Sequence, residues 1–417
     1  MIMEEKKMKH IVLLAAIIIA MNSNVLAQKN CANDSTGLIP LIDLTGKTWR
    51  GFTGGLYPDG SNARPVAHKG KSLLQSQSVK PLDGNGAVSP TGKIVWIGVG
   101  ASNPRTEFIR FSNQMDTFGL KNPALKLINT CIGGQGIQKM NSQTDNYWKQ
   151  ADKQLSDSGL TNKQVQIAWI ETDNTQTGDT TFPQAPQMLI QDFQTLLVTM
   201  KQLYPNLKLC YITARAYSGY ADASAGATAG KGLLFPRDYL NGWAIKWLIE
   251  KQINGENGYE FEGASASIPF ITWGTYNWAD GSIKRSDGLQ WLCDSDIGED
   301  GLHLSATGEI KSGALMFDYF TKDETTQAWI MKPTVSDITE EEVISPDEIS
   351  IMPNPVNNEL TIHVGNVSRA VQISNILGQN IWSGVVGSES KIDTREWIPG
   401  IYSVRIGEKG LVIQVSR

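Results

Sequence analysis

The chain has 417 residues, of which 41% are hydrophobic and 19% are charged, a composition typical of folded protein. Its formal net charge of −5 provides no basic surface, so we expect no nucleic-acid partner. No CxxC pair and no His/Cys spacing typical of zinc occurs, so we expect no metal site.

The N-terminus has the features of a secretory signal peptide. Three lysines precede an apolar run over residues 11–21, and the small residues of "NVLA" offer a cleavage site after Ala27. The apolar run is too short to span a bilayer, so residues 1–27 predict export without a transmembrane segment. Initiation at Met8 rather than Met1 remains open.

Cysteine is sparse after the predicted cleavage point. The four that remain are Cys31, Cys131, Cys210 and Cys293. In an exported protein they can pair in three ways, and the sequence leaves all three open.

Residues 28–330 alternate between strand-like and helix-like segments. Apolar runs of strand length occupy 92–100, 124–129, 165–171 and 207–213. Their near-continuous apolarity is typical of parallel strands that are buried on both faces. Apolar residues at helical spacing occupy 186–208, 239–253 and 307–320. This alternation predicts a three-layer α/β fold with a parallel sheet, whose ligands bind at the carboxyl ends of the strands.

The C-terminal part has a different pattern. Residues 331–347 are acidic and poor in aromatic residues, which is typical of an exposed linker. Residues 348–417 contain short β-branched runs separated by Gly, Asn and Ser. They predict a small all-β sandwich.

Two glycine-containing turns follow the first two predicted strands. Ser102 stands in "GVGASNP", where a sharp turn exposes a hydroxyl that can act as a nucleophile; the alternative is a serine that caps a helix. Gly134 stands in "CIGGQG", where free backbone N–H groups can form an oxyanion hole; the alternative is a tight turn without chemistry. No GxxxxGK[ST] motif supports a phosphate loop.

Polar residues follow the third strand and precede the last helix. Asp173 and Asn174 would lie at the carboxyl edge of the sheet, where an amide can donate to an oxyanion; an Asx-turn is the alternative. Asp300 and His303 are three residues apart, so the carboxylate can orient the imidazole, although such pairs also occur by chance. The other histidines lie in the signal peptide, the C-terminal part and a segment around His68 that we interpret as a surface loop.

Together these blocks, over about 92–322, resemble the SGNH, or GDSL, hydrolase superfamily. The resemblance implies a triad of Ser102, His303 and Asp300, with Ser102 and Gly134 donating backbone N–H groups to the oxyanion. Asp173 stands where the family has its donor asparagine, so either Asn174 takes that role one position later or the site is weakened. Ala101 also replaces the family's usual aspartate. Such a mechanism requires no cofactor.

The C-terminal part resembles the sorting domain of type IX secretion substrates. The matching segments are "ISIMPNPVNNELTI", "ISNILGQNIW" and "IDTREWIPGIYSVRI". The resemblance implies contact with the type IX secretion machinery and a secreted or cell-surface location. A carbohydrate-binding β-module is the alternative.

Two further segments have both a functional and a structural interpretation. The aromatic residues of 273–281, with Arg215, Tyr217 and Tyr220, form either a sugar-stacking wall or part of the core. The acidic run "CDSDIGED" around Asp294 is either a metal site or a solvated loop.

We therefore predict an exported serine esterase that acts on acyl esters of carbohydrates, acetyl esters in particular. The alternative is a non-catalytic carbohydrate-binding protein on a degenerate hydrolase scaffold.

Overall fold

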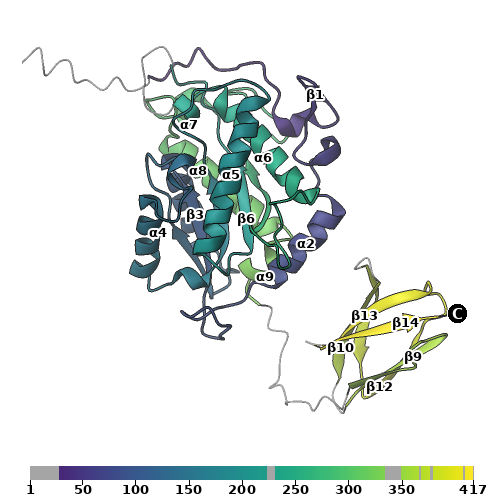
Figure 1. Ribbon diagram of the computed structural model, residues 1–417. Coiled ribbons are helices and arrows are strands. Elements are labelled where there is room, and N and C mark those ends of the chain that lie inside the picture. The colour runs from purple at the N-terminus through teal and green to yellow at the C-terminus, as the bar shows by residue number, and fades with distance from the viewer. Residues whose placement is uncertain are drawn as a thin grey trace, which may run out of the picture. The chain divides into compact units, whose positions relative to one another are not determined.

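A computed structural model describes residues 28–222, 231–333, 349–365, 368–375, 379–406 and 409–416 (Figure 1). The chain divides into two compact units, Met1–Pro333 and Thr334–Arg417. The predicted signal peptide and most of the predicted linker lie outside the described residues. Met331 forms a β-bridge with Lys121, and the backbone N–H of Lys332 donates to Leu120. Both residues are therefore attached to the first unit.

The first unit is built on a five-stranded parallel sheet. Its strands lie in the order β4 (Leu125–Asn129), β3 (Ile94–Gly100), β5 (Val165–Glu171), β6 (Leu209–Ala214) and β7 (Phe270–Tyr276). The predicted α/β fold with a parallel sheet is confirmed. Strand β7 was not predicted, because the aromatic residues of "FITWGTY" were given other interpretations.

Helices pack on both faces of this sheet, because successive strand residues point to opposite sides. Val95, Ile97 and Val99 belong to one core, whereas Ile94 and Trp96 belong to the other. The first core is covered by α4 (Asn146–Asp157), α5 (Gln184–Leu203) and α6 (Arg237–Ile253). The second is covered by α3 (Ser102–Thr117), α8 (Ala306–Lys322) and α9 (Gln327–Ile330). The remaining elements of this unit are β1 (Thr48–Trp49), β2 (Phe52–Thr53), α2 (Val66–Gln77) and α7 (Cys293–Asp296), with short 3₁₀ turns between them.

One disulfide fastens the N-terminal segment to the domain. Cys31 pairs with Cys293, whereas Cys131 and Cys210 are buried and free. Nearby, the buried carboxylate of Asp280 accepts hydrogen bonds from the hydroxyls of residues 35 and 36 and the backbone N–H groups of residues 36 and 37. These contacts hold the start of the domain against the loop that follows β7.

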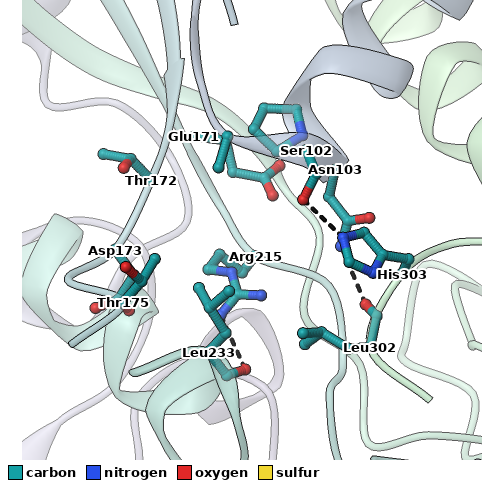
Figure 2. Close-up of a pocket in the computed structure, with 12 residues that line it drawn as sticks. Ser102, Asn103, Glu171, Thr172, Asp173, Thr175, Arg215, Leu233, Leu302 and His303 are labelled. Carbon is teal, nitrogen blue, oxygen red and sulfur yellow. Dashed lines mark hydrogen bonds between the residues drawn. The ribbon is translucent and has the colours of Figure 1, made fainter. Parts of the chain in front are cut away.

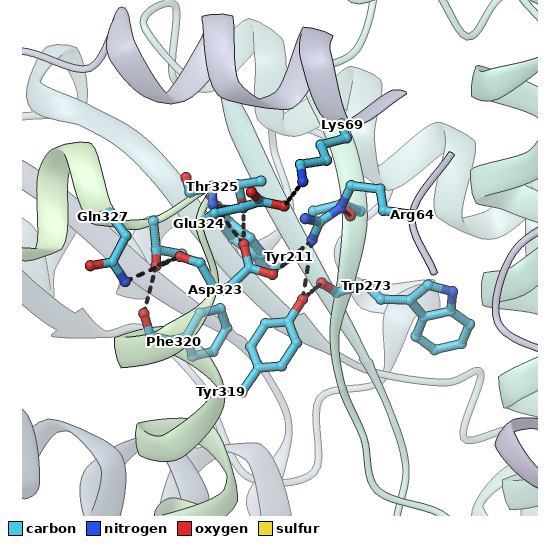
Figure 3. A network of polar contacts seen from close by, with 12 residues as sticks. Arg64, Lys69, Tyr211, Trp273, Tyr319, Phe320, Asp323, Glu324, Thr325 and Gln327 are labelled. Carbon is cyan, nitrogen blue, oxygen red and sulfur yellow. Dashed lines mark hydrogen bonds and ion pairs between the residues drawn. The ribbon is translucent and has the colours of Figure 1, made fainter. Parts of the chain in front are cut away.

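A polar network ties α2 and the segment before it to the end of α8 (Figure 3). Arg64 lies 3.0 Å from Asp323 and donates to the hydroxyl of Tyr319, which in turn donates to the carbonyl of Trp273. One turn further, Lys69 pairs with Glu324 at 2.6 Å. The network is structural, since its members link three elements around a packed core.

His68 lies beside this network, and its predicted place in a surface loop is wrong. It is 4% exposed within α2, and its ring stacks on Phe270 with centroids 4.4 Å apart. Burial and the neighbouring charge of Arg64 lower the pKa of His68 to about 4, so the ring is neutral at physiological pH. Helical periodicity in this segment is weak, and only the packing of α2 buries the residue.

The second unit is all-β, as predicted. One antiparallel sheet has the order β11 (Asn380–Val386), β10 (Arg369–Asn375), β13 (Gly400–Ile406) and β14 (Lys409–Val415). The other has the order β12 (Glu389–Asp393), β9 (Glu359–Val364) and β8 (Ile349–Met352). Alternate residues of the strands enter a single apolar core. In the described part of both units, no helix is long and apolar enough to cross a bilayer.

Candidate active site

Ser102 is the first residue of α3, and a single residue separates it from the carboxyl end of β3. The turn requires glycine, because a Cβ on Gly100 would lie 2.3 Å from the carbonyl oxygen of Glu171. Ala101 is the N-cap and no side chain caps the helix, so Ser102 does not have the structural role considered above. Its hydroxyl lies 2.7 Å from Nε2 of His303 (Figure 2).

The loop before α8 brings His303 and Asp300 to this serine. Nδ1 of His303 lies 2.5 Å from Oδ2 of Asp300. Burial opposes the charge on Asp300, but hydrogen bonds from the side chain and backbone of His303 and from the backbone of Leu302 outweigh it, lowering the pKa of Asp300 to about 2. Asp300 is therefore an ionised acceptor for the N–H of Nδ1, and the other ring nitrogen, Nε2, faces the hydroxyl of Ser102.

Asn103 fixes this loop against the nucleophile, and sequence reasoning missed it. Its Nδ2 donates to the carbonyl of Leu302 at 3.1 Å, and its Oδ1 accepts from the backbone N–H of Leu304 at 3.2 Å. The two hydrogen bonds bracket His303, so the residue after the serine holds the segment that carries the histidine. Nothing in the local sequence distinguishes this asparagine, because its partners are backbone groups 199 and 201 residues away.

Three predicted residues thus meet, but two others do not join them. Gly134 lies in an exposed turn after β4 and is not part of the wall of the cavity at Ser102. Asn174 is also absent from that wall, since its side-chain amide donates to Asp192 at 3.0 Å. Neither residue lines the cavity, whereas Ser102 does, and its backbone N–H, in the first turn of α3, has no intrahelical acceptor.

Asp173 does line the cavity, but its carboxylate is already bound. Oδ1 accepts from Arg237 at 2.5 Å and from the backbone of Asn174 at 2.7 Å, and Oδ2 accepts from Asn241 at 3.1 Å. Burial raises the pKa of Asp173, although the charge and hydrogen bond of Arg237 oppose this. The ion pair explains why an aspartate is tolerated at a position where the sequence led us to expect an amide.

A pair of carboxyl groups lies next to the nucleophile. Glu171, the last residue of β5, lines the cavity and is hydrogen-bonded to Glu107 of α3. Glu107 also accepts from Ser312 and Asn277. Burial, together with the charge of Glu107, raises the pKa of Glu171 well above its ordinary value of 4.5. The raised pKa of Glu171 favours its protonated form, in which it can donate to Glu107.

The other candidate segments are structural. Tyr217, Tyr220, Trp273 and Trp278 are each at most 1% exposed, so these rings belong to the core, and of the two interpretations above the structural one is confirmed. The acidic residues near Asp294 form ion pairs with different lysines: Asp296 pairs with Lys311, and Glu299 with Lys29. Among the described residues, the only group with metal-ligand spacing contains both cysteines of the disulfide and Asp294, so it offers no metal site.

The C-terminal unit matches the family model of the secretion system C-terminal sorting domain over residues 350–415. The predicted type IX sorting domain is confirmed, and the protein is therefore secreted or located at the cell surface. The domain also implies contact with the secretion machinery. No curated protein sequence matches the chain.

Several solved structures resemble parts of the chain. PorZ, a surface component of the type IX secretion system of Porphyromonas gingivalis, is 22% identical, with 17% of this chain and 12% of that chain covered and a TM-score of 0.16. The YxiM protein of Bacillus subtilis is 11% identical, with 55% and 56% covered and a TM-score of 0.30. A gut microbial diltiazem-metabolizing enzyme is 11% identical, with 74% and 72% covered and a TM-score of 0.30. At these TM-scores the likenesses carry no argument about the site.

Proposed function

We propose that the first unit is a serine ester hydrolase of SGNH type. The observation that carries the proposal is the continuous hydrogen-bonded row from Ser102 through His303 to Asp300, with distances of 2.7 and 2.5 Å. In the proposed reaction His303 removes the proton from Ser102 as its oxygen attacks the ester carbonyl. The protonated ring then donates to the leaving alcohol. In the second step His303 removes a proton from water, which attacks the acyl-enzyme. The ring then returns the proton to the oxygen of Ser102.

Two features suit this chemistry. The side chain of His303 is 45% exposed and that of Asp300 is 28% exposed, so the pair is accessible to a substrate in solution. The cavity at Ser102 is small, with a volume of about 20 Å³, and is open to solvent, which favours a small group such as acetyl. Acetyl esters of carbohydrates are the substrate class that we favour, because the protein is exported and small acyl groups on polysaccharides are accessible outside the cell.

The test uses the exported chain without its signal peptide. We expect a fluorophosphonate probe to label the wild type at Ser102 and acetate to be released from 4-nitrophenyl acetate and acetylated xylan. Ser102→Ala and His303→Ala should abolish acetate release, and Ser102→Ala should also abolish labelling. Ser112→Ala on the same helix and His363→Ala in the sorting domain are the matched controls. Activity that survives both active-site substitutions would contradict the serine mechanism.

A non-catalytic carbohydrate-binding protein is the second candidate. The observation that favours it is that Gly134 and Asn174, the expected oxyanion donors, do not line the cavity. A folded wild type that is neither labelled by the probe nor active on any ester, but that binds an oligosaccharide, would support this candidate against the first.

A further inference from the structure

Arg215 is the one charged group in the described wall of the cavity that forms no direct pair with another charged group. It follows β6 directly, is 5% exposed, and lies across the cavity from His303 (Figure 2). Asp173 is paired with Arg237, Glu171 with Glu107, and His303 with Asp300. No carboxylate of the described residues lies within 4.0 Å of the Arg215 guanidinium, although its charge opposes the rise in pKa of buried carboxyl groups further away, among them Glu171 and Asp238.

The hydrogen bonds of this guanidinium are also incomplete. One terminal nitrogen donates to the carbonyl of Leu233 at 3.0 Å. The other guanidinium nitrogens have no acceptor among the described residues, and they are not sealed in the protein interior. The hydroxyl of Thr172, in the same wall, is buried and likewise has no partner in the described part of the chain. This side of the cavity therefore presents donors without acceptors.

A buried guanidinium whose N–H groups lack acceptors is costly, because the loss of its hydration is not offset by hydrogen bonds. A planar guanidinium with one free edge matches the two oxygens of a carboxylate, and such charge-assisted pairs are stronger than neutral hydrogen bonds. A substrate carboxylate would supply both a direct ion pair and the missing acceptors. The carboxylate of Asp173 cannot do so, because Arg237 and Asn241 already hold it.

We propose that Arg215 determines specificity by binding a carboxylate that the ester substrate carries in addition to the scissile bond. This inference rests on the hydrolase function proposed above and narrows it to esters of acidic compounds, such as an acylated sugar acid or the monoester of a dicarboxylic acid. Arg215 acts on substrate binding, whereas Ser102 and His303 perform the reaction.

The test compares esters that are matched in shape and differ in charge. For a carboxylate on the acid side, the pair is monoethyl succinate and ethyl levulinate; for the alcohol side, it is 3-acetoxybenzoate and 3-acetoxybenzamide. Acid release by the chain without its signal peptide is followed by titration at constant pH. We expect the wild type to prefer the anionic member of one pair in kcat/KM, and Arg215→Met to lower that preference by roughly 10- to 100-fold.

Three further results decide the role of Arg215. Arg215→Met should lower kcat/KM more on the anionic ester than on the matched neutral ester, because the lost contact is with the carboxylate. Arg215→Lys keeps the positive charge but not the two parallel N–H donors of the guanidinium, so it should lose part of the preference for the anionic ester. It also serves as the test if Arg215→Met does not fold. Arg110→Met, which breaks a pair with Glu309 on the helix surface, should change no preference. An equal loss on neutral and anionic esters, or no loss, overturns the proposal.

Binding separates this inference from the hydrolase function. Calorimetry with succinate and 3-hydroxybenzoate should show binding to Ser102→Ala, and no binding to the Ser102→Ala, Arg215→Met double variant. If the wild type hydrolyses no ester but this difference is found, the hydrolase proposal fails and the carboxylate site stands. If neither compound binds to Ser102→Ala, the carboxylate site fails, whatever the activity.

Discussion

The two walls of the cavity differ in how their polar groups are used. On the wall formed by α3 and the loop before α8, Ser102, His303 and Asp300 form one hydrogen-bonded row that ends at an accessible hydroxyl. On the wall formed by the loop after β5, Asp173 is bound to Arg237 within the domain, and Asn174, which follows it but does not line the cavity, is bound to Asp192. The first wall keeps its reactive groups available, whereas on the second the carboxylate of Asp173 stabilises the fold. Substitutions of Ser102, His303 or Asp300 should therefore change activity, and substitution of Asp173 should change stability.

The largest expected effect is on the first wall. Asp300→Asn should lower kcat by about 10⁴-fold, because an amide no longer fixes the tautomer in which Nε2 accepts from Ser102. Thermal unfolding should change little, since the carboxylate of Asp300 is partly exposed. Kinetics with 4-nitrophenyl acetate measure the loss, and Glu299→Gln, one residue earlier and exposed, is the control.

The second prediction tests the other wall. Asp173→Asn introduces the amide that the resemblance to SGNH hydrolases led us to expect, yet it should not raise activity. It should lower the free energy of unfolding by about 3 kcal/mol, because Arg237 is left buried without its counter-charge. Urea denaturation measures this change.

The control for Asp173→Asn is Asp157→Asn, which breaks an exposed pair with Lys153 and should cost less than about 1 kcal/mol. A variant Asp173→Asn that is as stable as the wild type and more active would reverse the comparison between the walls.

A smaller loss of activity is expected for Asn103, a residue of the first wall that positions His303 but takes no part in the proton transfers. Asn103→Ala removes both hydrogen bonds that bracket His303, so kcat should fall by roughly 10- to 100-fold while KM is nearly unchanged. Asn103→Asp retains the acceptor for Leu304 and should recover part of the loss. A change in KM alone would show that Asn103 contacts substrate rather than positioning the histidine.

The smallest expected effect concerns the carboxyl pair between the walls. The folded-state pKa of Glu171 is raised above 4.5, so its contribution to stability is full below that pH and is lost as the pH rises through the folded-state value. Glu171→Gln keeps a donor to Glu107 without a titrating proton. The melting temperature of the wild type should therefore fall from about pH 5 to pH 8 more steeply than that of the variant. Parallel pH profiles of the two proteins would contradict a shared proton.

The sequence by itself determined the class of the fold and the residues of the row. Parallel strands that are buried on both faces must be continuously apolar, so four strands of the sheet were recognisable from composition alone. Polar residues directly after such strands meet at one edge of the sheet, which placed Ser102 there, and the resemblance to SGNH hydrolases implied that Asp300 and His303 join it. Strand β7 was missed because its aromatic residues did not distinguish a buried strand from a binding surface.

Only the tertiary structure decided how the remaining polar groups are paired. Arg237 binds the carboxylate of Asp173, Asp192 accepts the side-chain amide of Asn174 that was the candidate oxyanion donor, and Glu107 pairs with Glu171 although 64 residues separate them in the sequence. Hydrogen bonds and ion pairs are short-ranged and directional, so their partners depend on distances that no local pattern contains. The same reason explains why Arg215, unremarkable in sequence, is left facing the cavity without a direct ion pair.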